Sequence, residues 1–120
     1  MLLPGFVDTH VHGGGGADTM DAGEAALTLA RLHARHGTTA LLATTMTAPL
    51  ADIEGALRAL APAIAQREAG AARLLGVHLE GPYISPDKLG AQPAYARPPS
   101  FAEIAALHGI APIRLVTLAP

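Results

Sequence analysis

The 120-residue sequence contains no cysteine, little charge and no long apolar run. Without cysteine, the chain forms neither disulfides nor thiolate metal sites. Charged residues make up 15% of the chain and the formal net charge is −2, which excludes the basic stripe of a nucleic-acid-binding protein. No segment reaches the ~20 apolar residues of a membrane span. The N-terminus has no basic region, and Pro4 and Gly5 interrupt its apolar run, so it does not resemble a secretory signal. We therefore expect a cytoplasmic protein without nucleic-acid or membrane partners.

What the sequence has in quantity is apolar residues, which make up half of the chain. A chain of this composition can bury a sizeable core, so disorder is not expected. The length suits one small domain.

Apolar, β-rich segments alternate with helical patterns along the chain. The predicted strands are 3–12, 38–45, 73–79 and 113–118, and the predicted helices are 22–36, 52–69 and 101–108. Asp21 and Glu24 are spaced as in a capping box, and Ser100 is a second candidate cap. Pro62 predicts a kink or break in the middle helix.

The order of these elements, β-α-β-α-β-α-β, is typical of a parallel α/β sheet. The strands are apolar throughout rather than alternating, so we expect both faces of the sheet to be covered. Two architectures fit: a small doubly wound sheet, or a partial (β/α)8 TIM-type barrel comprising about the first four strands and three helices. A complete barrel needs about 250 residues, so the chain would be less than half of one.

Two histidines close the first predicted strand. His10 and His12 are two residues apart, so their side chains point to the same face, at the carboxyl end where ligands gather in α/β folds. Two neutral imidazoles form a good ligand pair for Zn²⁺ or a similar divalent ion. The plainer interpretation is a strand end that carries two histidines without a metal.

A second pair, His78 and Glu80, repeats this pattern on the third strand. Glu80 could ligate the same metal or bridge two ions. Taken alone, the pair fits better a glutamate that caps a turn and a histidine in the core, whereas together with His10 and His12 on nearby strand ends it favours a metal site. Asp8, two residues before His10, is a candidate to support the ligands from behind, and so is His78.

Other features are less specific. The glycine run 13–16 matches neither phosphate-binding pattern and predicts a tight turn. The proline-rich segment 83–99 is long for a connection, which is typical of functional or disordered loops. His33, His36 and His108 lie on predicted helices, and we expect them at the surface or at an interface.

Several stretches together resemble the amidohydrolase superfamily, and within it the N-acetylglucosamine-6-phosphate deacetylase family. The first-strand motif P-G-F-V-D-T-H-V-H-G indicates the superfamily. More specific are H-L-E-G-P and the G-A-Q segment after it. The matching stretches span residues 4–13, 36–39, 44–45, 76–83, 88–92 and 117–120.

This resemblance implies a metal-dependent barrel that removes acetate from N-acetylglucosamine 6-phosphate in amino-sugar breakdown. It implies that Glu80 ligates one divalent ion and that His10 and His12 hold another, so one or two ions bind per complete subunit. Ala91 and Gln92 match the loop that contacts the sugar, although many members carry histidine in place of Gln92. The complete enzyme would be a homodimer.

The resemblance also predicts what the chain lacks. The family's two later metal-binding histidines and its proton-shuttling aspartate have no counterpart, so no catalytic residue is assigned within residues 1–120. We expect an incomplete barrel domain over 1–120 that is inactive and poorly folded as a separate monomer. The alternatives are another amidohydrolase-superfamily hydrolase or a non-catalytic, metal-binding remnant.

Overall fold

The computed structural model describes residues 2–119 as a four-stranded parallel sheet with three α-helices. The sheet strands are β1 (Phe6–Val11), β4 (Thr38–Thr44), β5 (Arg73–Glu80) and β6 (Ile113–Thr117). The helices are α1 (Ala25–Arg35), α2 (Leu50–Ala65) and α3 (Phe101–Ile110). The remaining elements are the short strands β2 (Gly13–Gly14) and β3 (Ala17–Asp18) and the 3-10 turn η1 (Pro86–Lys88). The predicted strands and helices are therefore confirmed, with shorter or shifted ends.

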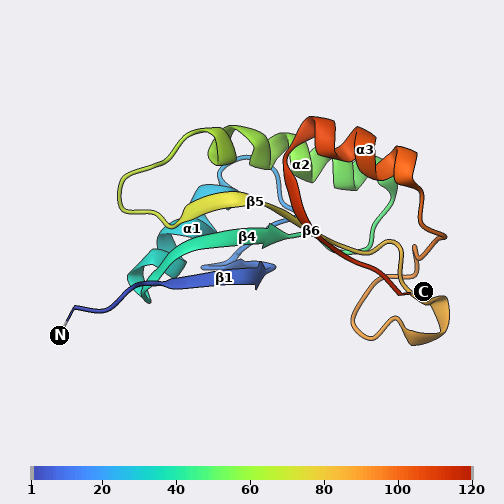
Figure 1. Cartoon of the computed structure of the whole chain (residues 1–120), viewed down its shortest axis with the longest axis horizontal. Helices are drawn as coiled ribbons and strands as arrows, with labels where there is room; N and C mark the ends of the chain where they lie inside the picture. Colours follow the sequence, from blue (N-terminus) through green and yellow to red (C-terminus); the bar gives the residue numbers. More distant parts are fainter. Residues whose placement is uncertain (1, 120) are drawn as a thin grey trace.

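The strands lie in the order β1-β4-β5-β6, so neighbours in the sheet follow one another along the chain. Each pair is parallel. Because right-handed crossovers that advance in one direction place every helix on the same face, this order is that of a barrel segment rather than a doubly wound sheet. Figure 1 shows α2 and α3 along one side of the sheet, and α1 also contacts α2.

The expectation that both faces of the sheet are covered holds only for the two central strands, where the consecutive residues 41–44 of β4 and 76–79 of β5 are buried. The helices cover one face, and β1 is mostly exposed, with Phe6 at 71% and Val7 at 61% relative exposure. The apolar strand pattern is instead that of barrel strands, whose second face looks into the barrel interior. The polar side chains at the carboxyl ends of the strands lie on this second face.

The core lies between the sheet and the helix layer. Leu29 of α1 and Leu57 of α2 are fully buried against Leu41 of β4 and Val77 and Leu79 of β5. On α2, the buried residues recur with helical spacing, which places one apolar stripe against the sheet. Each such leucine contributes roughly 1.5–3 kcal/mol by leaving water, so the core fixes where the strand ends lie.

The start of α1 differs from the predicted capping box. The helix begins at Ala25 after Glu24, without a side-chain cap. The Asp21 carboxylate instead accepts a hydrogen bond from the Asp18 N–H over 2.9 Å. Gly23 has a φ of +73°, so the chain turns between Asp21 and the helix and removes Asp21 from capping range. The Ser100 cap is confirmed, since its hydroxyl accepts from the Glu103 N–H.

Of the kink or break predicted at Pro62, the break is wrong. The helix α2 contains Pro62 and continues one turn to Ala65, and the Gln66 N–H donates to the Pro62 carbonyl over 3.1 Å. Pro62 lies in the last turn, so its missing N–H and its ring disturb only the end of the helix. None of the helices among the described residues is long and apolar enough to span a membrane.

The glycine run forms a tight hairpin next to β1. Gly13 and Gly14 pair antiparallel with Ala17 and Asp18. Gly15 and Gly16 make the turn with φ values of +66° and +81°, a conformation that favours glycine at both positions. The predicted tight turn is confirmed, although the two short strands were not expected.

Candidate metal centre

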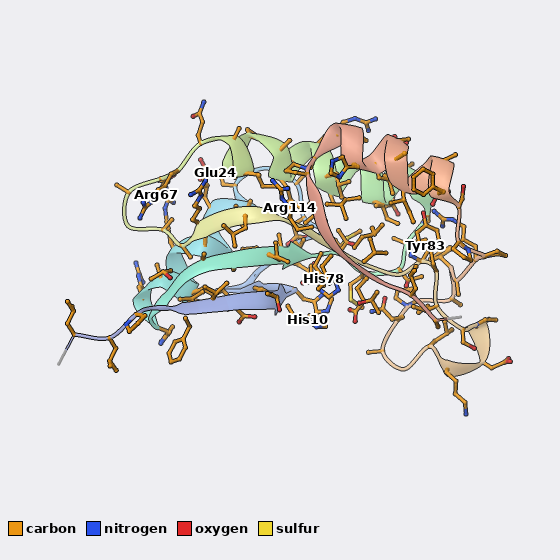
Figure 2. The ribbon with its side chains drawn as sticks, viewed as in Figure 1. His10, Glu24, Arg67, His78, Tyr83 and Arg114 are labelled. Carbon is orange, nitrogen blue, oxygen red and sulfur yellow. The ribbon has the colours of Figure 1, made fainter. Side chains whose placement is uncertain are left out.

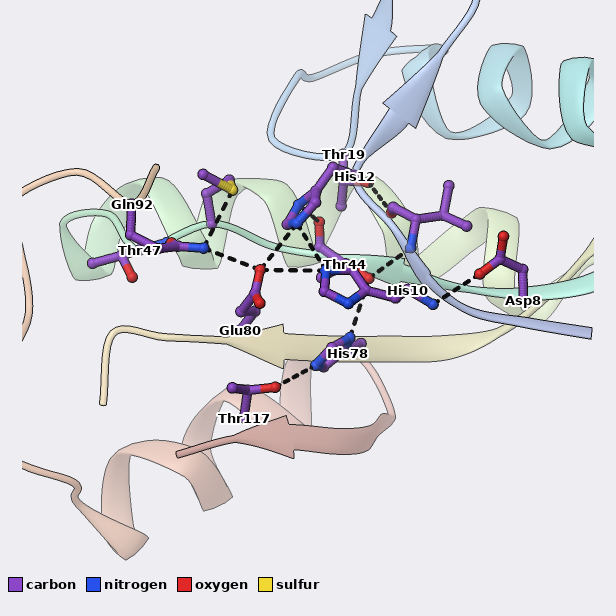
Figure 3. A network of polar contacts seen from close by, with 12 residues as sticks. Asp8, His10, His12, Thr19, Thr44, Thr47, His78, Glu80, Gln92 and Thr117 are labelled. Carbon is purple, nitrogen blue, oxygen red and sulfur yellow. Dashed lines mark hydrogen bonds and ion pairs between the residues drawn. The ribbon is translucent and has the colours of Figure 1, made fainter. Parts of the chain in front are cut away.

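Three potential ligand atoms converge at the carboxyl ends of β1 and β5. His10 lies on β1, His12 follows its last residue, and Glu80 ends β5. The His12 Nε2 lies 3.0 Å from His10 Nε2 and 2.9 Å from Glu80 Oε2, and the His10 Nε2 to Glu80 Oε2 distance is 3.4 Å. Figure 3 shows these contacts meeting between the two strands. We call these three residues the histidine–glutamate cluster.

The donor set of this cluster suits a divalent ion. Imidazole nitrogen and carboxylate oxygen bind Zn²⁺ at about 2.0–2.2 Å, so tetrahedral ligands lie about 3.3–3.5 Å apart. The three observed separations are close to this spacing, and all the offered ligand atoms lie within 4.8 Å of one another. Three protein ligands with an open fourth position are typical of catalytic zinc sites. Small side-chain adjustments suffice to place an ion among them.

Thr44 at the end of β4 orients His12. The His12 Nδ1 lies 3.2 Å from the Thr44 carbonyl oxygen, and a carbonyl only accepts, so Nδ1 carries the proton. In the neutral ring this leaves the lone pair on Nε2, which faces Glu80. The Thr44 hydroxyl accepts from the Val11 N–H over 2.9 Å and ties β4 to the residue before His12. An outer hydrogen bond of this kind fixes the ligating tautomer.

His78 and Asp8, the two residues predicted to support the metal ligands, contact different parts of His10. The His78 ring packs edge-on against the His10 ring, with centroids 4.9 Å apart, and Figure 2 shows the two side chains together. Its nitrogens contact the hydroxyls of Thr44 and Thr117 at 3.3 and 2.8 Å. Asp8 instead accepts from the His10 backbone N–H over 3.1 Å. Both residues therefore contact His10, and neither belongs to the converging group.

Burial, assisted by the nearby His10 ring, lowers the pKa of His78 below its ordinary value. His78 is only 2% exposed. A neutral imidazole at this position adds no positive charge behind the cluster. The neutral His78 ring therefore does not repel a cation bound at the histidine–glutamate cluster.

The predicted sugar-contacting segment reaches the cluster through one of its two residues. Gln92 donates from Nε2 to Glu80 Oε2 over 3.0 Å, whereas Ala91 is exposed. The segment 83–99, which we call the 83–99 loop, contains η1 and is otherwise irregular. It returns to the strand ends at Gln92.

Two residues around the glycine hairpin were missed by sequence reasoning. Thr19 is buried and donates to His12 and Val11 carbonyls, from its N–H over 2.7 Å and from its hydroxyl over 3.2 Å. His33, predicted at the surface or at an interface, is half-buried and donates to the Gly13 carbonyl over 3.0 Å. Both contacts bridge elements, so no local pattern reveals them.

A second polar cluster lies beyond the end of β5, and we call it the clamp. It consists of Tyr83, Arg97 and Glu103. The Glu103 carboxylate accepts from the Tyr83 hydroxyl over 2.7 Å and from Arg97 over 2.6 Å. Figure 2 shows Tyr83 toward α3, apart from His10 and His78. The clamp joins both ends of the 83–99 loop to α3.

The clamp has perturbed ionisation. Burial alone would raise the pKa of Glu103, but the hydrogen bonds from Arg97 and Tyr83 and the charge of Arg97 outweigh it, so the pKa lies below its ordinary value. Burial, followed by the hydrogen bond to Glu103 and its charge, raises the pKa of Tyr83. The phenol therefore stays protonated and the carboxylate charged at neutral pH.

Comparison with known proteins gives one family and several close relatives. Residues 1–112 match the model of the amidohydrolase family. The chain is 42% identical to the N-acetylgalactosamine-6-phosphate deacetylase of Escherichia coli O157:H7, covering all of this chain and 33% of that protein. It is 44% identical to the N-acetylglucosamine-6-phosphate deacetylase of Bacillus subtilis strain 168, covering all of this chain and 32% of that protein.

A solved structure agrees with these relatives. The chain superposes on a variant of the N-acetyl-D-glucosamine-6-phosphate deacetylase of Mycobacterium smegmatis, in complex with N-acetyl-D-glucosamine 6-phosphate, with a TM-score of 0.84 and 38% identity. The match covers 98% of this chain and 30% of that one. The chain thus spans about a third of the length of the curated relatives it matches. The expected partial barrel is confirmed.

Proposed function

The chain belongs to the amidohydrolase family, and we propose on that premise that its protein removes acetate from N-acetylglucosamine 6-phosphate. The observation that supports this most is the convergence of His10, His12 and Glu80 at the carboxyl ends of parallel strands. Because the chain spans about a third of its relatives, the activity is proposed for the protein at the full length of its gene.

In this proposal His10, His12 and Glu80 hold the divalent metal, zinc or a similar ion, either as three ligands of one ion or as two sites that share Glu80, since the resemblance assigned the histidines and Glu80 to separate ions. Bound there, such an ion supplies Lewis acidity, which makes hydroxide available near neutral pH and polarises an amide carbonyl. The Thr44 carbonyl keeps the His12 proton on Nδ1, so Nε2 stays available as a ligand. The half-exposed His10 leaves the cluster open to substrate on one side. Among residues 2–119, we assign none to protonation of the leaving amine.

The second candidate substrate is the 4-epimer, N-acetylgalactosamine 6-phosphate. It is favoured by the similarity to a relative that is named for that sugar. We propose the glucosamine sugar first because the B. subtilis relative and the superposed M. smegmatis structure carry that name. Under the resemblance, Ala91 and Gln92 contact the sugar.

Acetate release by the purified full-length protein tests the function. We expect turnover of N-acetylglucosamine 6-phosphate well above that of unphosphorylated N-acetylglucosamine, and loss of turnover after chelation with recovery on adding Zn²⁺. The galactosamine epimer, assayed in parallel, decides between the two sugars. Equal turnover of phosphorylated and unphosphorylated sugars, or full activity in chelator, would contradict the proposal.

Together with this function we propose three further properties of the protein: its number of metal ions, its oligomeric state and its location. We propose one or two ions per subunit, to be counted by elemental analysis of the dialysed protein. We propose a homodimer, to be checked by light scattering during gel filtration. We also propose a cytoplasmic location, to be checked by cell fractionation.

A further inference from the structure

The side chain of Gln92 bridges the backbone of Thr47 and the carboxylate of Glu80. The Thr47 N–H donates to Gln92 Oε1 over 2.7 Å, and Gln92 Nε2 donates to Glu80 Oε2 over 3.0 Å. Figure 3 shows three contacts that meet at the Glu80 carboxylate, from Gln92, His10 and His12. The same oxygen that faces His10 and His12 is thus held by the amide.

The orientation of this amide follows from its partners. A backbone N–H only donates, so the oxygen of Gln92 must face Thr47. The NH2 group then faces Glu80, whose Oε2 accepts its hydrogen bond. Reversing the amide would place two donors together at Thr47 and two acceptors together at Glu80. Both bonds therefore select one orientation.

Thr47 is a rigid anchor for this bridge. It is fully buried in the connection between β4 and α2. Its side chain lies directly against Gly81, the residue after Glu80, so closely that a Cβ at Gly81 would overlap it. Gly81 also has a φ of +68°, which favours glycine. The Thr47 N–H is consequently fixed relative to the end of β5.

The loop that carries Gln92 is anchored as well. The Arg97 N–H donates to the Pro82 carbonyl over 2.9 Å, and the Arg97 side chain reaches the Ala48 carbonyl at 3.3 Å. The Gln92 N–H closes a local turn onto the Leu89 carbonyl over 3.0 Å. The main chain therefore presents the amide at a defined position rather than from a free loop.

We propose that Gln92 is a positioning residue, which holds Glu80 Oε2 toward His10 and His12 through its amide N–H. This inference rests on the proposed metal centre. Gln92 acts on the ion only through Glu80, because its amide oxygen is engaged by Thr47. The second N–H has only a weak partner, the Met46 sulfur at 3.6 Å, and stays available for substrate.

A histidine at this position could make the same bridge. A neutral imidazole offers one acceptor and one donor nitrogen, as the Gln92 amide offers one acceptor oxygen and a donor NH2. A methionine has similar length but neither strong donor nor strong acceptor. These two substitutions therefore separate the hydrogen bonds from the volume of the side chain.

The test measures Zn²⁺ affinity by competition with a chromogenic chelator, using the full-length protein. We expect Gln92→Met to lower the affinity about 10–100-fold, the usual cost of removing an outer partner, and Gln92→His to stay within a few-fold of wild type. The visible spectrum of the Co²⁺-loaded protein should change in Gln92→Met and return in Gln92→His. Gln66→Met, at an exposed glutamine after α2, is the matched control.

Equal Zn²⁺ affinities and unchanged Co²⁺ spectra in wild type and Gln92→Met would overturn the inference. If Gln92→Met does not fold, Gln92→Asn replaces it, since the shorter amide cannot reach both partners and should lower affinity similarly. Wild-type protein that binds no Zn²⁺ would overturn both this inference and the proposed function. If wild type binds Zn²⁺ but releases no acetate, the proposed function fails and the Gln92 comparison still decides this inference.

Discussion

The histidine–glutamate cluster and the clamp both follow the strand ends, yet they differ in how their polar groups are paired. In the clamp, one carboxylate receives hydrogen bonds from an arginine and a phenol, so charge and donors balance within the cluster. In the histidine–glutamate cluster, the lone pair of His12 Nε2 and an oxygen of the Glu80 carboxylate face each other at 2.9 Å, with His10 Nε2 close to both. That arrangement is balanced only when a cation or a proton lies between them.

The two clusters also differ in how far their side chains are exposed to solvent. The Arg97 and Glu103 side chains are 28% and 19% exposed, and Tyr83 is 1% exposed. The His12 and Glu80 side chains, at 33% and 18%, are similarly exposed, and the His10 side chain, at 50%, is the one that is clearly more open to solvent. A polar cluster whose hydrogen bonds are made within the cluster, away from water, stabilises the fold. A cluster whose acceptor atoms converge and that is open to solvent on one side is suited to binding a ligand. Perturbed ionisation alone does not separate them, since the clamp shows it too.

Removing one of the proposed metal-ligating side chains should have the largest effect and tests the difference between the two clusters most directly. We expect His12→Ala to lower the Zn²⁺ affinity of the full-length protein by more than about 100-fold, beyond the cost of removing an outer partner. The thermal midpoint of the metal-free protein should change little, because His12 is partly exposed. His36→Ala, at an exposed histidine after α1, is the control. Unchanged Zn²⁺ affinity in His12→Ala would exclude this residue from the site.

The clamp should respond in the opposite way. Glu103→Gln removes the charge that pairs with Arg97, and we expect it to lower the free energy of unfolding by about 1–3 kcal/mol. Urea unfolding followed by circular dichroism measures this loss. Zn²⁺ affinity should fall less than in His12→Ala, since the clamp reaches the cluster only through the 83–99 loop. A stability loss below about 0.5 kcal/mol would mean that the clamp is not a brace.

The strands and the convergence of His10, His12 and Glu80 could be predicted from the sequence for related reasons. The buried runs ending at Thr44 and Glu80 are apolar and β-rich, and the parallel order brings their carboxyl ends together. His10 and His12 stand out because two histidines with the two-residue spacing of a strand point to one face at its carboxyl end. Residue type and spacing suffice for such features.

The supporting contacts could not be predicted, because they join residues far apart in the chain. Gln92 bonds a backbone N–H 45 positions away, and Thr44 accepts from Val11 across 33 positions. Such pairs depend on the register of β1, β4 and β5, which includes irregular shifts in both pairings. The late start of α1 has a local cause, the positive φ of Gly23, that a capping pattern does not contain.

Lowering the pH should reduce the stability that the clamp contributes, because Glu103 becomes protonated. The pKa of Glu103 is lowered in the folded chain, so its stabilisation is fully present above the unfolded glutamate pKa of about 4.3 and is lost as pH falls through the lower folded value. Wild type should therefore lose more unfolding free energy than Glu103→Gln between neutral pH and about pH 3. Parallel pH profiles for the two proteins would contradict the assignment. Urea midpoints at each pH give the comparison.

The smallest effect tests whether pairing or burial makes the clamp a brace. Glu54 and Arg58 on α2 form an ion pair at 2.8 Å, one turn apart, with side chains 33% and 62% exposed. The distance resembles that in the clamp, but water solvates both charges. We expect Glu54→Gln to cost about 0.3–0.5 kcal/mol of unfolding free energy, and less at high salt. If the same substitution costs as much at Glu54 as at Glu103, then charge pairing alone explains both, and burial does not distinguish the clamp from an ordinary surface pair.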